Sequence, residues 1–339
     1  MEIDLETLLT PPTIAQDATE EEASETYTRW FDTLTETLLA HAKLVVGKET
    51  FKFLELECYL RDPEHLPDPF THGHADQAEP ARWYFHKLRN SNSYVGGTRK
   101  GLDVTIGGNS VRGGILIRRL ARDAESMADG PASFIDGPSK VLDVIFDTLH
   151  VKNSAEMVET QLKQDLRAWP DASPLHIRLD MPSPKELPRK RRRDEPIYKG
   201  YRIGLLPGNG KPSLQLRLYY MTRFWRYFVM PEAAQHKIMN AISLLHQGYD
   251  VEDVQHLLAQ RRPSNIHLLL SQGYERGTKC ILACVGKQQL RVSDLVMLYG
   301  AAQWWLNNGR FDLCVLDCLP DCLPICFEDI PMSDTEYTR

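Results

Sequence analysis

Charged and aromatic side chains share one face of a predicted strand. The segment "FLELECYL", which begins at Phe53, alternates apolar and polar residues, so Glu55, Glu57 and Tyr59 fall on one face of the strand. A carboxylate near an arginine in a partly apolar cleft can hold and deprotonate a water molecule. Arg118, at the end of the strand-like "GILIR", supplies such a cation. The alternative is a charged but solvated sheet face, which is common in alternating strands.

A histidine-rich loop follows this strand. It carries His65, His72 and His74 and is stiffened by three prolines. An aromatic ring and an imidazole placed near each other could enclose a flat ligand. We expect His65 and His74 to face solvent, because loops of this kind are exposed.

The elements that would position these residues predict an α+β fold, with a mostly antiparallel curved sheet or partial barrel, flanking helices and a smaller all-α C-terminal region. Glycine-separated runs such as "GLDVTIGG" and "GGILIRRLA" read as paired strands, and "IYKGYRIGLL" and "RLYYMTRFWRYFVM" as further strands. Helical spacing is predicted from Glu25 to about Lys48 and after the Gly-Pro turn of "FIDGPSKVLDVIFDTL". The expected regions are a disordered acidic arm (1–24), a main domain (25–230) with a basic, proline-rich insertion (about 182–196), a helical region (231–326) and a tail (327–339).

The helical region begins with three short predicted helices. The first ends at Gly248, the second runs from about Val251 to Gln260, and Pro263 precedes the third. This order is compatible with a helix-turn-helix. The third helix is too apolar to display polar groups to bases, which favours a packed helical appendage. Further helices are expected from about Leu290 to Leu306.

Composition places the chain among ordinary globular proteins. It is 42% hydrophobic and 25% charged, and its formal net charge is −6. No apolar run is long enough to cross a membrane, and the acidic start differs from a secretory signal, so we expect an intracellular, nuclear or cytoplasmic monomer. The basic "PRKRRR" could be a nuclear localisation signal, a nucleic-acid contact or a solvated linker. Cys314, Cys318, Cys322 and Cys326 lack the usual spacing of zinc ligands and read as small apolar residues, so we expect no metal and no cofactor.

Six segments, in order from about Trp30 to Met230, resemble the methylpurine (alkyladenine) DNA glycosylase family. They are "LELECYL", "DPFTH", "GILIRRL", "DGPSKVLDVI", "YRIGL" and "RFWRYFV". The resemblance implies a glycosylase fold and hydrolysis of an N-glycosidic bond. Such hydrolysis passes through an oxocarbenium-like state, and a positively charged base leaves readily, so one carboxylate can suffice.

Carried over by position, the resemblance makes Glu57 the general base and gives Arg118 the role of orienting the water or stabilising charge. Tyr59 and His72 would stack on the extruded base, with Tyr94 as a further candidate. Ser139 and Lys140 would lie at a helix N-terminus near the nucleic-acid backbone. Glu55 is the alternative base if the strand register slips by two residues.

The family has a tyrosine-rich strand whose aromatic ring wedges into the DNA duplex. In this chain Arg99 and Lys100 stand at that place, and we expect them to contact the nucleic-acid backbone. The family's amide-bearing residue has no clear equivalent, with Asp103 or Thr105 nearest. The sequence therefore predicts an N-glycosylase that acts on a modified or damaged base in nucleic acid. DNA is the expected polymer in preference to RNA. The alternatives are a catalytically inert nucleic-acid-binding protein and a hydrolase of a small nucleoside-like substrate.

Overall fold

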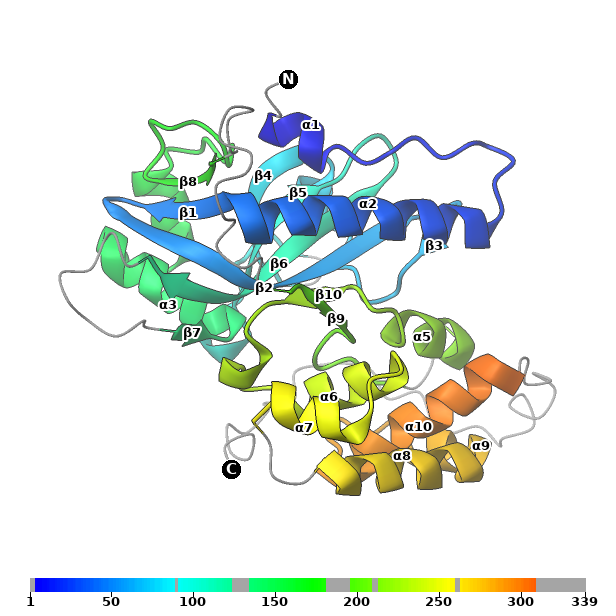
Figure 1. Cartoon of the computed structure of the whole chain (residues 1–339). Helices are drawn as coiled ribbons and strands as arrows, with labels where there is room; N and C mark the ends of the chain where they lie inside the picture. Colours follow the sequence, from blue (N-terminus) through cyan, green and yellow to red (C-terminus); the bar gives the residue numbers. More distant parts are fainter. Residues whose placement is uncertain are drawn as a thin grey trace, which may run out of the picture.

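The computed structural model describes residues 4–88, 91–123, 134–180, 196–208, 213–259 and 263–308. A curled antiparallel sheet, covered by helices, lies above a helical C-terminal region (Figure 1). This confirms the α+β fold predicted from the sequence. Within the described residues, no helix has the length and apolar character needed to cross a membrane.

The sheet contains ten strands within the described residues. They are β1 (Ala42–Val46), β2 (Glu49–Asp62), β3 (Leu66–Pro67), β4 (Pro80–Phe85), β5 (Leu102–Ile106), β6 (Arg112–Arg122), β7 (Phe134–Asp136), β8 (Leu175–Leu179), β9 (Tyr198–Gly200) and β10 (Arg226–Phe228). The main order is β4-β5-β6-β2-β1-β8. In addition, β3 and β10 pair with β2, β7 pairs with β6, and β9 pairs with β10.

The long strand β2 organises the sheet, because it pairs with β1, β3, β6 and β10. Leu56, Cys58 and Leu60 point into the main hydrophobic core, as the alternation predicted. A bulge interrupts the pairing with β6 on both sides of Glu55, and Leu54 packs in a separate small cluster. Bulges change the direction of side chains, so the bulge explains why Leu54 does not join Leu56, Cys58 and Leu60 in the main core.

Helices cover both the sheet and the chain that follows it. They are α1 (Leu5–Leu9), α2 (Glu20–His41), η1 (Ala75–Gln77), η2 (Gly97–Arg99), α3 (Pro138–Leu149), α4 (Ser154–Glu156), η4 (Met157–Gln161), α5 (Leu214–Met221), η5 (Pro231–Ala233), α6 (Lys237–His246), α7 (Val251–Leu257), α8 (Pro263–Arg276), α9 (Thr278–Cys284) and α10 (Val292–Asn308). In Figure 1, α2 crosses one side of the sheet, and its buried side chains join the main core.

The N-terminal segment differs from the predicted disordered arm. Leu5 and Leu9 of α1 are buried in the main core. The helix α2 begins at Glu20, five residues earlier than predicted, because Thr19 and Glu22 form a reciprocal capping box. It ends at His41, and the residues that were predicted to extend it form β1.

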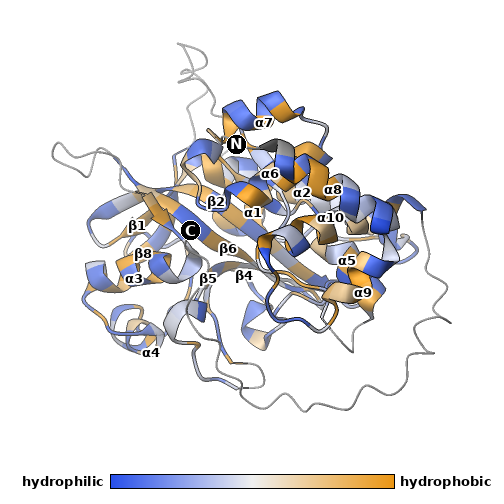
Figure 2. Ribbon diagram, turned by 90° about the horizontal axis from the view of Figure 1, so that it is seen from below, coloured by the Kyte–Doolittle hydropathy of each residue, from blue (hydrophilic) through white to orange (hydrophobic). Residues whose placement is uncertain are grey.

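The C-terminal helices form a second hydrophobic core. Leu244, Val254, Ile281 and Leu298 are buried there, together with Phe228 of the sheet. Figure 2 shows hydrophobic and hydrophilic stretches alternating along these helices, as amphipathic packing requires. The three predicted helices are confirmed as α6, α7 and α8. Since α8 packs against α6, α7 and α10, the packed-appendage interpretation fits better than a DNA-reading helix.

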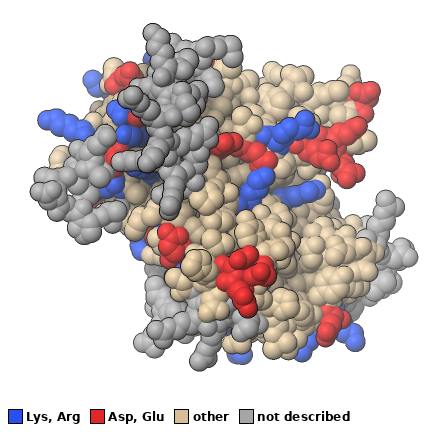
Figure 3. All heavy atoms as spheres, in the orientation of Figure 1, with Lys and Arg blue, Asp and Glu red and all other residues tan. Residues whose placement is uncertain are grey.

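The segment "RLYYM" is helical and not extended. It was predicted as part of a strand, but it belongs to α5, which Ser213 caps through a side-chain bond to the Leu216 N–H. The basic run of the insertion and the four C-terminal cysteines lie outside the described residues. Figure 3 shows acidic side chains gathered at one end of the face that α2 crosses, where Glu20, Glu21 and Glu22 begin that helix.

Candidate functional site

Glu57, Tyr59 and Arg118 meet on the polar face of the sheet. Glu57 Oε2 accepts hydrogen bonds from the Tyr59 hydroxyl at 2.8 Å and from Arg118 Nη1 at 3.4 Å. Glu57 Oε1 accepts a bond from the Ile203 N–H at 2.7 Å. The Glu57 side chain is 0% exposed and Arg118 is 8% exposed. The predicted proximity of Glu57, the proposed general base, to Arg118 is therefore present, but the Glu57 carboxylate is enclosed by protein.

Glu55 belongs to the same buried network. Its Oε1 accepts bonds from Arg118 Nε at 3.1 Å and from Arg226 Nη1 at 3.3 Å. Burial alone would raise the pKa of Glu55, but the charges of Arg226 and Arg118 outweigh it and hold the pKa below its usual value. With two guanidinium partners, Glu55 is a charged group with a structural role.

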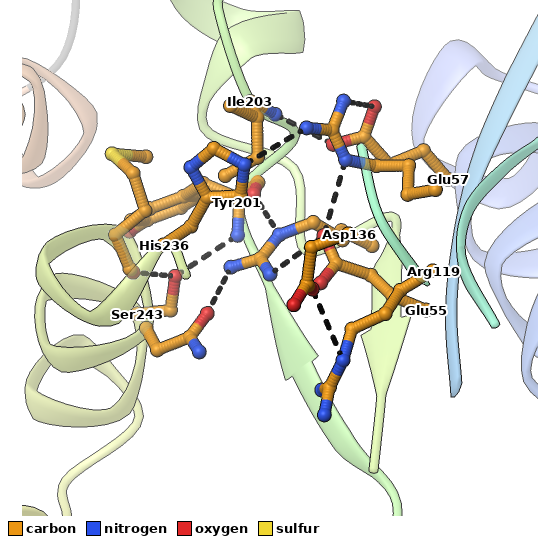
Figure 4. Close-up of polar contacts among 12 residues, drawn as sticks. Glu55, Glu57, Arg119, Asp136, Tyr201, Ile203, His236 and Ser243 are labelled. Atoms are coloured by element: carbon orange, nitrogen blue, oxygen red, sulfur yellow. Dashed lines mark hydrogen bonds and ion pairs between the residues drawn. The ribbon is translucent and has the colours of Figure 1, made fainter. Parts of the chain in front are cut away.

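The C-terminal region closes this network from the other side. Figure 4 shows His236 and Ser243 approaching from the side of α6, whereas Glu55 and Glu57 come from the sheet. Arg118 Nη2 lies 3.3 Å from His236 Nε2, and Arg226 Nη2 donates to Asn240 Oδ1 at 2.8 Å. Burial and the charge of Arg118 lower the pKa of His236 to about 4, so the imidazole is neutral at pH 7 and Nε2 can accept this bond.

A pocket of about 340 Å³ opens next to this network. It is lined by Tyr59, Phe70, His72, Gln77, His86, Lys87, Leu88, Val95, Arg99, Asp103, Leu116 and Leu205. Its size is within the range of small-molecule sites. Tyr59 and His72, the predicted stacking residues, both line the pocket. Glu57, the proposed general base, and Arg118 are not among its lining residues.

Tyr59 connects the pocket with the buried network. Tyr59 lines the pocket, Arg202 Cζ lies 4.6 Å from the centroid of its ring, and its hydroxyl donates to Glu57. Burial and the negative charge of Glu57 raise the pKa of Tyr59 well above its ordinary value. The phenol is therefore a neutral donor to Glu57 at all moderate pH values.

The loop histidines are less exposed than predicted. His65 is 9% exposed and lies 3.2 Å from Asp62 through Nδ1. His74 caps η1 by accepting from the Asp76 N–H, and its ring stacks on Tyr84. His65 is thus buried and His74 half-buried, each held by local hydrogen bonds that a general rule about loops cannot predict. His72 lies beside the same ring, with Nδ1 2.5 Å from the Tyr84 hydroxyl.

The predicted backbone contacts are split between two places. Arg99 is exposed and lines the Tyr59 pocket. Lys100 instead lies on a neighbouring pocket of about 610 Å³, where its Nζ contacts Ser139 Oγ at 3.0 Å and Asp143 at 2.8 Å. Tyr94 lines this second pocket too, with an edge contact to Phe85, and is therefore not placed as a third wall around Tyr59. Lys140 is exposed in the first turn of α3.

One polar pair in the pocket was missed by the sequence analysis. Asp103 is 3% exposed, and its Oδ1 lies 2.8 Å from His86 Nε2. Gln77 Nε2 approaches Asp103 Oδ2 at 3.4 Å. Asp103 had been noted as a neighbour of the missing amide, but His86 stands in an aromatic run, "RWYFHK", which gives no sign of its partner on the next strand. Among the described residues, no group of three or more His, Cys, Asp or Glu side chains could hold a metal ion.

Comparison with known proteins adds little to this geometry. No family model matches the chain. An uncharacterized protein, L759, of Acanthamoeba polyphaga mimivirus is 36% identical over 89 residues, which is 26% of this chain. The match spans 40% of the viral protein's length.

Proposed function

We propose that the protein hydrolyses the N-glycosidic bond of a modified or damaged base in nucleic acid, with DNA as the substrate in preference to RNA. The observation that carries the proposal is the dual position of Tyr59. Tyr59 lines a pocket of base-compatible size, while its hydroxyl binds the buried carboxylate of Glu57. The basic insertion supports a nuclear location for such an activity.

In this proposal, the base enters between Tyr59 and His72. Stacking on aromatic side chains contributes about 1–3 kcal/mol per base and tolerates different bases. The exposed Arg99 at the pocket can meet a phosphate, which fits a polymeric substrate. The acidic first turn of α2, in contrast, repels nucleic acid from that end of the molecule.

Glu57 would activate the attacking water. A carboxylate oxygen has two lone-pair sites, and among the described residues Oε1 receives one donor, the Ile203 N–H. The second site on Oε1 is chemically able to accept a proton from water. Arg118, whose Nη1 lies 3.4 Å from Glu57 Oε2, would help to orient that water. Water must reach Oε1 through a movement of the segment that carries Ile203.

The enclosure of Glu57 favours a second candidate. A general base must come within hydrogen-bond reach of the water that it deprotonates, directly or through one water. Glu57 is 0% exposed and is bonded at both oxygens. A nucleic-acid-binding protein that uses the pocket without hydrolysis is compatible with this arrangement, in which the ion network has a structural role.

The Glu57→Gln variant tests between the two. Glutamine keeps the shape of the side chain and one acceptor oxygen but cannot take a proton from water, so base release should fall by about 100- to 10,000-fold. Release is measured from alkylated and deaminated DNA in single- and double-stranded form, from RNA and from nucleosides. Glu64→Gln, on an exposed glutamate of the following loop, is the matched control and should keep wild-type rates.

Stability must be measured beside activity. Removing one partner of a buried ion pair costs about 3–5 kcal/mol, and the retained acceptor should make the loss in Glu57→Gln smaller. A folded variant that binds nucleic acid like wild type but releases no base supports the enzyme. If wild type binds but releases no base from any of these substrates, the binding-protein candidate replaces it.

A further inference from the structure

A second pocket, of about 610 Å³, adjoins the pocket that Tyr59 lines. Val95 lines both pockets, so the two meet at this residue. We call the surrounding stretch of chain (94–100) the dividing segment, because its residues serve both sides. Arg99 lines the first pocket. The second pocket is lined by Tyr94, Gly96, Gly97 and Lys100. A ligand that fills both pockets must therefore cross the dividing segment.

Two glycines leave the middle of the dividing segment bare. Gly96 and Gly97 are exposed, and a Cβ atom added at either position would meet no atom within 4 Å. Gly97 also has a φ of +63°, a conformation that residues with a side chain rarely adopt. The backbone at this point is therefore open to solvent, and a chain-like ligand can pass over it from one pocket to the other.

Lys100 holds the dividing segment against α3. Its ammonium donates to the Gly97 carbonyl at 3.1 Å and to Ser139 Oγ at 3.0 Å, and it pairs with Asp143 at 2.8 Å. A lysine ammonium has three donors, so these contacts use all of them. Lys100 is therefore a positioning residue, which fixes the wall between the two pockets and neutralises the carboxylate of Asp143.

The other groups of the second pocket suit a nucleotide. Its volume is within the range of roughly 300–1,000 Å³ of small-molecule sites. Tyr94, which is half-buried, and Phe146, which is buried, supply aromatic surface for a base. The exposed amides of Asn92 and Asn153 can bond to the edge of a base. Lys152 is exposed, and within the described residues its ammonium pairs with no carboxylate, so it is available for a phosphate.

We propose that the second pocket binds the nucleotide next to the one whose base enters the first pocket, and that the substrate is therefore single-stranded DNA. This inference rests on the proposed function of the first pocket. The phosphate that links the two nucleotides crosses the dividing segment at Gly96 and Gly97. Arg99 then lies on the side of the first pocket and Lys152 on the side of the second.

The substrate class follows from the separation of the two pockets. A base that is enclosed by protein is neither paired with a complementary strand nor stacked on its neighbour in a duplex. Two consecutive nucleotides in separate pockets must therefore both be unpaired. A single strand meets this condition without any loss of base pairs, whereas a duplex would have to lose at least two.

The first test measures binding, which requires no chemistry. Thymidine 5′-phosphate and the thymidylyl dinucleotide compete with a fluorescein-labelled, eight-residue oligothymidylate, and fluorescence anisotropy gives their affinities. The dinucleotide should bind wild type at least about tenfold more tightly than the mononucleotide, because its second base adds a stacking contact. Ala155→Trp, at an exposed residue that lines the second pocket, should fill the pocket and remove this advantage.

Ala283→Trp, at an exposed position of α9, is the matched control and should keep the advantage. An equal affinity of wild type for the two ligands, or an undiminished advantage in Ala155→Trp, would overturn the second pocket as a nucleotide site. Annealing the oligothymidylate to oligoadenylate should weaken its binding at least about tenfold. A duplex that binds as tightly as the single strand would overturn the substrate class.

Lys152→Ala supplies a second readout that depends on charge. Each phosphate contact to a single strand contributes about 0.7 to the slope of log affinity against log salt concentration. We expect the slope for the oligothymidylate to fall by about 0.7 in this variant, with no change in Lys279→Ala, an exposed lysine of α9. An unchanged slope in Lys152→Ala contradicts the phosphate contact.

These outcomes are separable from those of the proposed function. If the dinucleotide and salt results are as expected but wild type releases no base from any substrate, the glycosylase proposal fails and the second nucleotide site stands. If wild type releases a base but the dinucleotide has no advantage, the second site fails and the glycosylase proposal stands.

Discussion

His236 and His246 are half-buried, and their lowered pKa values tie the stability of the fold to pH. Burial lowers the pKa of each to about 4, helped at His236 by the charge of Arg118. The unfolded chain titrates near the ordinary value of 6.5 and so binds more protons than the folded chain between about pH 6.5 and 4. The stabilisation by neutral histidines is therefore complete above pH 6.5 and declines as the pH falls toward 4.

We predict that each of these histidines contributes about 1–2 kcal/mol to the fall in the free energy of unfolding between pH 7 and pH 5. Urea denaturation at both pH values measures it. In His246→Gln, one titrating group is removed, so the difference between the two pH values should shrink by its share. His267→Gln, at an exposed position of α8, is the control and should leave the difference unchanged. An unaltered difference in His246→Gln would mean that this histidine titrates normally in the fold.

At the scale of elements, α8 and α10 touch through glycines. A Cβ atom at Gly300 would lie 2.0 Å from the Leu270 carbonyl oxygen, and one at Gly273 would lie 2.0 Å from the Met297 carbonyl oxygen. These contacts are to backbone, which cannot turn aside as a side chain can. The two helices must therefore separate to accept any larger residue.

Gly300→Ala should destabilise the protein by about 1–3 kcal/mol, even though alanine is the better helix former by about 1 kcal/mol. Chemical denaturation of the purified variant measures the change. Gly96→Ala makes the same substitution in an exposed loop, where no atom lies within 4 Å of the added Cβ, and should be nearly neutral. A stabilised Gly300→Ala would show that the helices are packed more loosely than the structure has them.

The sequence predicted those elements whose signals are local. The helical spacing of apolar residues was sufficient to predict α6 and α7, and the alternation of Leu56, Cys58 and Leu60 was sufficient to predict β2. Burial of one face of an element leaves such a regular pattern in the sequence. The aromatic segment that became α5 was misread, because its strand propensity is overridden by the Ser213 cap and by tertiary packing.

The candidate site was predictable only in part for the same reason. Strand alternation places Glu57 and Tyr59 on one face, and the resemblance gives Arg118 and His72 their roles beside them. The closure of Glu57 by Ile203 joins residues far apart in the chain, as does the contact between Arg118 and His236. Nothing in the local spacing records such contacts. The same is true of His86 and Asp103, which meet across neighbouring strands.

At the scale of the whole molecule, a buried polar network joins the two hydrophobic cores. Arg226 lies in the sheet, where it donates to Glu55 and to the Tyr201 carbonyl, and it also donates to Asn240 of α6. Arg226 is 0% exposed, so each of these acceptors is needed to offset the loss of water. Such a network resists partial opening, because separating the cores would break hydrogen bonds of the buried Arg226 guanidinium. We therefore expect the sheet and the C-terminal helices to unfold together.

Asn240→Ala tests this coupling. It removes the acceptor of Arg226 Nη2 and should cost about 1–3 kcal/mol or more, because a buried charged donor is left unsatisfied. Hydrogen exchange locates the loss. Peptides from β1, in the first core, and from α10, in the second, should lose the same amount of protection free energy, since both exchange through one global opening. Asn265→Ala, on the exposed side of α8, should change neither. Faster exchange confined to α10 would mean that the helical region opens by itself, and the network would then be a contact between two independent units.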